Sequence, residues 1–226
     1  MENFYYITIA TKPHKVLDKL IERVKKNNEK IEVLGMSENR QIGWENQQRF
    51  GVKLREVSDF LKRPYLKPND IVLFTDAYDV AYFGTRKEII ERFILFKYPI
   101  VFGSEKDCHP DAKRSKEYKI TDKEFSFLNS GMFIGRVDAL KYCILNYKYN
   151  DTDDDQRYWT TQFLENPDMI TLDYDNALFL NTSGFNETNF IFDINYNVAF
   201  YKCKNPLFIH VNGPEKSFIN DLVGII

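Results

Sequence analysis

The first 105 residues alternate short apolar runs with segments whose apolar residues recur at helical spacing. The apolar, β-prone runs lie near residues 5–10, 31–34, 71–75 and 100–104. The helical patterns lie between them, near residues 16–24, 52–61 and 85–96. The run at 71–75 is apolar at nearly every position, which is typical of a strand covered on both faces. This alternation predicts an α/β fold with a mostly parallel, Rossmann-like sheet flanked by helices.

The alternation breaks after about residue 105, where a polar stretch leads to a predicted strand at 125–135. Asn129, Ser130 and Gly131 interrupt the apolar pattern of that strand, and we expect the break to form a cleft. Helical patterns return near 138–147 and 156–164, and short strands are expected around Ile170, Phe190 and 207–210. A chain of 226 residues fits one domain, and we expect a single folding unit.

Composition narrows the function classes. The net charge of -2, from 31 basic and 33 acidic residues, provides no overall field that would attract nucleic acid. No run approaches the ~20 apolar residues of a membrane span. The three cysteines are widely spaced, which predicts free thiols rather than a disulfide framework. Because the first ten residues resemble a strand more than a signal peptide, a cytoplasmic location is expected for the chain as it stands.

Asp76 and Asp79 lie just beyond the carboxyl end of the strand expected at 71–75. In open α/β sheets, ligands bind at that edge. Two hard carboxylate oxygens suit Mg²⁺ or Mn²⁺ that also binds phosphate oxygens. The alternative is that one aspartate caps the turn while the other is solvated. A phosphatase with an aspartyl nucleophile is a minor alternative, since it needs a second aspartate where this chain has Tyr78.

An acidic run precedes the helix expected at 156–164 and consists of Asp151, Asp153, Asp154 and Asp155. Acidic residues at a helix N-terminus are ordinary capping residues, so this run has a structural explanation. Gln156 and Trp159 follow it and would supply a hydrogen-bonding amide and a stacking surface for a sugar. A carboxylate that faces a sugar can also stabilise oxocarbenium charge. The run therefore indicates a pocket for a donor sugar or an acceptor.

His210 ends the strand expected at 207–210, and a turn with Asn212, Gly213 and Lys216 follows it. Imidazole is a good third ligand for Mn²⁺, and a lysine can neutralise a diphosphate. A lone histidine at a strand end is more often structural. The metal hypothesis for His210 therefore depends on its combination with the two aspartates.

Eight ordered segments resemble the glycosyltransferase domain of the procollagen lysyl hydroxylases, a resemblance that runs through nearly the whole chain. The segments are Ile7–Thr11, Val33–Gly35, Gly51–Leu54, Val72–Val80, Phe102–Glu105, Leu128–Gly135, Asp153–Gln156 and His210–Lys216. The resemblance implies a GT-A type fold over residues 1–226. Residues 1–105 would form the nucleotide-binding half, and residues 106–226 would form the acceptor half with a C-terminal loop that closes over the metal.

The resemblance also assigns site residues. Asp76, Asp79 and His210 match the metal ligands of the family, with Mn²⁺ as the cofactor and Mg²⁺ as its alternative. The acidic run Asp153, Asp154 and Asp155 matches its catalytic segment. Expected donor-binding residues are Thr11, Trp44, Lys53, Tyr78, Asn212, Gly213 and Lys216. The expected sugar or acceptor pocket comprises Asn129, Ser130, Gly131, Gln156, Trp159 and His109.

The activity that the resemblance implies is retaining transfer of glucose from UDP-glucose to galactosyl-hydroxylysine of a collagen-like protein. Galactosyl transfer to hydroxylysine or to another glycan is the first alternative, and an inactive module that binds UDP-sugars is the second. One departure from the family is Cys108-His109-Pro110, where the family commonly has a tryptophan, so sugar contacts there are expected to differ. We also expect a stand-alone transferase module without a hydroxylase domain, and a homodimer is a further expectation.

Overall fold

A computed structural model describes residues 2–43 and 49–225. Its central element is a six-stranded sheet with the strand order β2-β1-β3-β6-β5-β7. The bounds are β1 (Phe4–Ile9), β2 (Glu32–Leu34), β3 (Ile71–Asp76), β5 (Ile100–Glu105), β6 (Phe127–Arg136) and β7 (Ile170–Asp173). Neighbouring strands are parallel, except that β6 runs antiparallel to β3 and β5. The prediction of an α/β fold with a mostly parallel sheet is confirmed.

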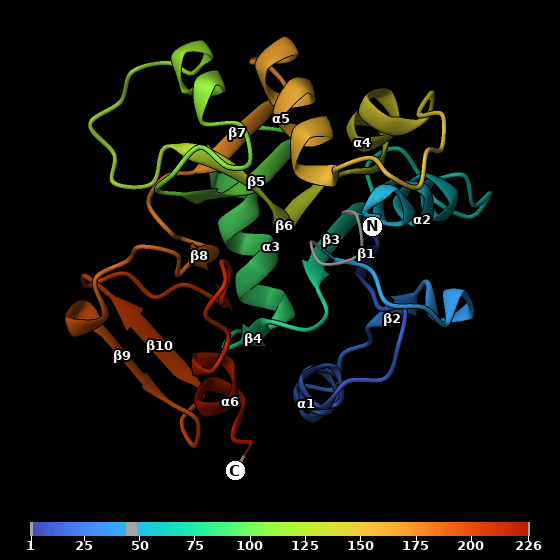
Figure 1. The fold of residues 1–226 in the computed structure, drawn as a ribbon. Helices are drawn as coiled ribbons and strands as arrows, with labels where there is room; N and C mark the ends of the chain where they lie inside the picture. Colours follow the sequence, from blue (N-terminus) through green and yellow to red (C-terminus); the bar gives the residue numbers. More distant parts are fainter. Residues whose placement is uncertain (1, 44–48, 226) are drawn as a thin grey trace.

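Helices cover both faces of this sheet (Figure 1). One core cluster joins one face to α2 (Gly51–Leu61), α4 (Val137–Ile144) and α5 (Asp155–Glu165). A second joins the other face to α1 (Lys15–Lys26) and α3 (Arg86–Leu95). Apolar side chains therefore alternate between two cores along the strands, as in β1, where Tyr6 and Ile7 belong to different clusters.

A smaller three-stranded sheet packs beside α3, with the order β4-β11-β8. It consists of β4 (Val80–Tyr82), β8 (Phe179–Asn181) and β11 (Phe208–His210). The predicted strand at 207–210 is confirmed as β11, whereas β4 and β8 are missed by the sequence pattern. Each has three residues, which is too short to show a periodicity of its own.

The remaining C-terminal elements gather near the chain end in Figure 1: the hairpin of β9 (Phe190–Asp193) and β10 (Val198–Tyr201), and α6 (Phe218–Val223). Short 3-10 turns lie at Met36–Glu38, Ala112–Glu117 and Glu187–Asn189. The expected irregularity near Asn129 is present in the pairing of β6 with β5. Along β5 the chain steps from Phe102 to Gly103, while the partner on β6 steps from Phe133 to Asn129, so the residues between these two partners are left out of the pairing. The strand β6 itself continues through them. Among the described residues, no helix has the length and hydrophobicity to cross a membrane.

Candidate metal centre and sugar site

The two candidate metal aspartates flank the turn between the large and small sheets. Asp76 is the last residue of β3, and Asp79 immediately precedes β4. The turn is held by Tyr78, whose hydroxyl accepts hydrogen bonds from the backbone N–H groups of Thr11 (2.8 Å) and Lys12 (3.0 Å). This contact ties the ends of β1 and β3 together, so the turn is fixed at the carboxyl edge of the sheet, where α/β folds bind ligands.

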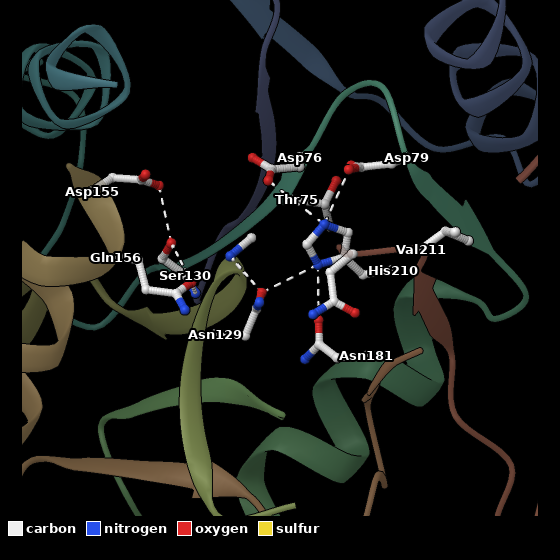
Figure 2. Close-up of polar contacts among 12 residues, drawn as sticks. Thr75, Asp76, Asp79, Asn129, Ser130, Asp155, Gln156, Asn181, His210 and Val211 are labelled. Carbon is white, nitrogen blue, oxygen red and sulfur yellow. Dashed lines mark hydrogen bonds and ion pairs between the residues drawn. The ribbon is translucent and has the colours of Figure 1, made fainter. Parts of the chain in front are cut away.

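His210 reaches the same place from the other end of the chain. Its strand β11 pairs antiparallel with β4, which sets His210 opposite Val80, and the N–H of Val211 donates to the carbonyl of Asp79 (2.8 Å). Figure 2 shows the imidazole directed at both carboxylates. Its Nε2 lies 3.3 Å from an Asp79 oxygen and 3.8 Å from an Asp76 oxygen. One ligand atom from each of the three residues fits within a 4.8 Å span.

Gly131 provides the space for the imidazole. The pairing of Thr75 with Met132 brings Gly131 on β6 beside the end of β3. A Cβ atom at residue 131 would lie 2.3 Å from Cε1 of His210 and 2.9 Å from Oδ2 of Asp76. Any larger residue would collide with two of the three candidate ligands. Gly131 was predicted as a sugar-pocket residue, and its closest contacts are with the metal centre instead.

The neighbouring charges and the burial of this centre shift the pKa values of its two aspartates in opposite directions. Burial raises the pKa of Asp76. Burial also acts to raise the pKa of Asp79, but His210 and Lys216 outweigh it and hold that pKa below its usual range. The ammonium of Lys216 lies 2.5 Å from the second carboxylate oxygen of Asp79. Two carboxylates and one imidazole nitrogen form a donor set that Mn²⁺ accepts well, so these residues fit the expected metal.

Lys53 connects the metal centre to the acidic run. Its Nζ lies 2.7 Å from Asp76 Oδ1 and 2.8 Å from Asp155 Oδ2, and its side chain is 10% exposed. Burial disfavours the charged ammonium, but the two carboxylates outweigh burial and raise the pKa of Lys53. Lys53 was predicted to bind the donor, and its described contacts place its ammonium between a candidate metal ligand and a candidate catalytic residue.

The three aspartates of the acidic run that were predicted to be catalytic differ in their surroundings. Asp155 is directed towards the centre, and its carboxylate also accepts a hydrogen bond from the Ser130 hydroxyl at 3.1 Å (Figure 2). Asp154 is the N-cap of α5, where its side chain accepts from the N–H of Arg157 at 2.9 Å. Asp153 accepts from the hydroxyl of Tyr147 at 2.9 Å. These contacts give structural partners to Asp153 and to one oxygen of Asp154, whereas the second oxygen, Asp154 Oδ2, is buried without a hydrogen bond. Asp155 is the strongest catalytic candidate, because it contacts Lys53 and Ser130 in the centre.

Glu105 is a site residue that the sequence reasoning did not single out. It ends β5, is 2% exposed, and accepts hydrogen bonds from the amides of Gln156 (2.5 Å) and Asn212 (2.8 Å). Burial raises its pKa to about 7. The Gln156 amide also donates to the backbone carbonyl of His109, and its oxygen accepts from the N–H of Ser130. The signal that could have indicated Glu105 is its place at the end of a buried strand, like Asp76.

The other predicted donor-binding residues lie at three places around the centre. Thr11 contacts Tyr78 just beyond the end of β1, and Lys216 forms an ion pair with Asp79. Asn212 and Gly213 form the turn after β11, where Gly213 has a φ of 91°, a conformation that favours glycine. Both polar atoms of the Asn212 amide are engaged, one with Glu105 and one with the N–H of Ser183. Trp44 lies outside the described residues.

Trp159 requires a correction. Its indole is 2% exposed and packs against the rings of Phe102 (5.2 Å between centroids) and Phe133 (5.3 Å). It therefore has no exposed face on which a sugar could stack. Gln156 and Trp159 lie on the same side of α5, three residues apart. Gln156 is in the first turn and reaches the site, whereas Trp159 is one turn further along and lies over the aromatic core of the sheet. His109, by contrast, is exposed at the rim.

A cavity of about 850 Å³ between α4 and α5 lies apart from these residues, and no predicted site residue lines it. Its lining includes Tyr142, Lys141 and Gln162. The chemistry of the side chains, rather than the size of the cavity, therefore defines the candidate site.

Comparisons with known proteins agree with this geometry. A family model described as the PLOD GT domain matches residues 1–226. A multifunctional procollagen lysine hydroxylase and glycosyltransferase of Caenorhabditis elegans is 33% identical over 96% of this chain and 31% of its own length. Procollagen-lysine,2-oxoglutarate 5-dioxygenase 1 of Bos taurus is 30% identical over 98% of this chain and 31% of its own length. The chain thus spans about a third of these relatives.

A crystal structure of a glycosyltransferase involved in glycosylation of the major capsid of PBCV-1 shares the fold, with a TM-score of 0.52 and 12% sequence identity. The alignment covers 98% of this chain and 99% of that one. The mixed sheet, with the paired aspartates at its edge and the histidine from a second sheet, agrees with a glycosyltransferase domain of the GT-A type, the class that the family model and the shared fold support. Within that class, the chain belongs to the PLOD GT domain family.

Proposed function

We propose that the chain is a Mn²⁺-dependent retaining glycosyltransferase that moves glucose from UDP-glucose to galactosyl-hydroxylysine of a collagen-like protein. The observation that carries the proposal is the continuous site formed by the Asp76, Asp79 and His210 cluster and by Asp155, joined through Lys53. Family membership supports the reaction class, and the names of the relatives support a collagen acceptor.

The residues of this site take distinct parts in the proposed reaction. Asp76, Asp79 and His210 would hold Mn²⁺, which when bound neutralises the donor diphosphate. Lys216 stands beside Asp79 and adds a positive charge for the same diphosphate. Lys53 keeps Asp155 oriented, and Asp155 stabilises the positive charge that develops at the anomeric carbon. The bond from that carbon to the UDP oxygen breaks, the acceptor oxygen bonds on the same face, and the hydroxyl proton leaves on a UDP phosphate oxygen.

Galactosyl transfer to hydroxylysine or to another glycan is the second candidate. The position of His109 supports this candidate. The residue is exposed, its own backbone carbonyl accepts a hydrogen bond from Gln156, and it replaces the tryptophan that the family commonly has there. An inactive module that binds UDP-sugars is the third candidate, and the complete set of ionic residues argues against it.

The test is a UDP-release assay with UDP-glucose and UDP-galactose, each with Mn²⁺ and with a chelator. A collagen peptide serves as acceptor before and after enzymatic galactosylation. Release that requires UDP-glucose, Mn²⁺ and the galactosylated peptide supports the proposal. Release that prefers UDP-galactose and the unmodified peptide supports the second candidate, and no release with any pair supports the third.

A further inference from the structure

Asn181 is the last residue of β8 and is fully buried in the small sheet. It stands directly opposite His210, because β8 and β11 are parallel neighbours and these two residues pair in register. The Asn181 side-chain oxygen lies 2.8 Å from Nδ1 of His210, on the far side of the ring from Asp76 and Asp79 (Figure 2). The asparagine therefore contacts the ring nitrogen that does not face the candidate metal.

The orientation of the Asn181 amide is fixed by a partner that can only accept a hydrogen bond. Its Nδ2 donates to the backbone carbonyl of Ser104 at 2.9 Å. A carbonyl can accept but cannot donate, so the NH₂ group must face Ser104 and the oxygen must face the imidazole. Gly103 makes this contact feasible, since a Cβ there would lie 2.9 Å from the Asn181 Nδ2.

The second group near Nδ1 is also an acceptor. Asn129 Oδ1 lies 3.2 Å from His210 Nδ1, and the same oxygen accepts the backbone N–H of Gly131 at 3.0 Å. An N–H group can only donate, which fixes the oxygen of the Asn129 amide in this position. His210 Nδ1 thus faces two carbonyl oxygens, and hydrogen bonding requires the ring hydrogen to be on Nδ1.

We propose that Asn181 is a positioning residue that fixes the neutral His210 ring in its Nδ1–H tautomer, so that Nε2 presents its lone pair to a metal held by Asp76 and Asp79. A ring nitrogen must be free of hydrogen to bind a metal, and the partner of the other nitrogen sets which one is free. Of the proposed function, this proposal requires only that a metal binds to Asp76, Asp79 and His210. It identifies β8, 29 residues before His210 in sequence, as part of the metal centre.

Two variants and one control test the proposal. Asn181→Leu removes the acceptor with a side chain of similar size, and Gly103→Ala displaces the amide without changing any residue that contacts the imidazole. Asn205→Ala is the control, because it removes an amide with a similar pair of hydrogen bonds, to the Ala199 carbonyl and from Arg92. Gly103→Ala also keeps the proposal testable if Asn181→Leu does not fold.

The affinity for Mn²⁺ is expected to fall about 10- to 100-fold in both variants and to stay unchanged in the control. It is measured by electron paramagnetic resonance, from the decrease of the signal of free Mn²⁺ as the protein binds it. The ring tautomer is read by ¹⁵N NMR of histidine-labelled, metal-free protein in alkaline buffer. The chain has three histidines, and His14 uses Nδ1 as an acceptor for the N–H of Val16, which gives an opposite reference signal. Wild type should show one Nδ1–H ring. In Asn181→Leu the population of that form should decrease, because only the longer contact to Asn129 Oδ1, at 3.2 Å, remains to hold the hydrogen on Nδ1.

Unchanged Mn²⁺ affinity in both variants would overturn the proposal. An Nδ1–H population that is undiminished in Asn181→Leu while the affinity falls would also overturn it, since the role of Asn181 would then be structural. Wild-type protein that binds no Mn²⁺ would instead refute the metal of the proposed function. The NMR measurement on wild type still decides the tautomer in that case, so the two failures are distinguishable.

Discussion

Substitution of Gly131 by alanine isolates the geometry of the metal centre, because it adds one methyl group and no charge. The new Cβ would lie 2.3 Å from Cε1 and 2.7 Å from Nδ1 of His210. Carbon atoms in contact prefer about 3.5–4.0 Å, so the imidazole must move by more than about 1 Å. The other atom in conflict, Oδ2 of Asp76, belongs to a second candidate ligand, so displacement in either direction disturbs the centre.

We expect Gly131→Ala to lower transfer activity by at least about 100-fold, the effect of a 1 Å misplacement in a catalytic site. We expect the free energy of unfolding to fall by about 1–3 kcal/mol, as in other overpacked interiors. The backbone at Gly131 lies in a β-strand, which alanine adopts without strain, so the collision alone causes the effect. Mn²⁺ affinity should fall as well, because the collision displaces a candidate ligand. Calorimetric titration measures that affinity, and UDP release and urea denaturation measure the activity and the free energy of unfolding.

Gly135→Ala is the matched control on the same strand. Its Cβ would meet Leu140 Cγ at 3.0 Å and Ile100 Cγ1 at 3.1 Å, which are side-chain atoms in the core, away from the metal centre. We expect a similar loss of stability with Mn²⁺ affinity retained. If Gly131→Ala binds Mn²⁺ as tightly as Gly135→Ala does, the inference that Gly131 makes room for a ligating imidazole is wrong.

Three further predictions concern the acidic groups. Asp155→Asn should abolish UDP release while Mn²⁺ binding in calorimetry persists, whereas Asp154→Ala should mainly cost about 1 kcal/mol of stability through the lost helix cap; equal loss of activity in both would contradict the separate roles. Lys53→Met should cost about 3 kcal/mol in urea denaturation, because it leaves the buried Asp155 and the partly buried Asp76 without their shared cation, and an unchanged midpoint would contradict the bridge. Because burial raises the pKa of Glu105 to about 7, the folded state holds that proton more tightly than the unfolded state. The stability of wild type relative to Glu105→Gln should therefore fall by about 3 kcal/mol as the pH rises from below the ordinary pKa of glutamate to above 7, and a difference that does not vary with pH would refute the buried carboxyl.

The parts of the fold that could be predicted from sequence are those with a strong local pattern. The run at Ile71–Asp76 is long and apolar enough to identify a central strand, and its position also indicates where Asp76 points. The strand β8 has three residues, and its pairing with β11 joins residues 29 apart, so no local pattern indicates it. Asn181 was missed for this reason. The polar end of the apolar run at 178–181 is the signal that could have shown it.

Trp159 shows the opposite failure, in which a side chain suited to sugar binding is used for packing. A tryptophan three or four residues into a helix is attractive for stacking, but the helix has one apolar face, and burial of an indole against Phe102 and Phe133 contributes a large hydrophobic stabilisation. Composition near an acidic run cannot separate these outcomes. Only the direction of the α5 face relative to the sheet does so.

The small sheet explains why the chain beyond residue 105 is integral to the metal centre. Asp76 and Asp79 come from one continuous strand–turn segment, but the third candidate ligand and its orienting asparagine come from β11 and β8. The antiparallel pairing of β4 with β11 places Asp79 beside His210, and the backbone N–H of Val211 donates to the carbonyl of Asp79 at the end of this pairing. The centre therefore exists only once the C-terminal strands have docked beside β4, which couples completion of the fold to competence for metal binding.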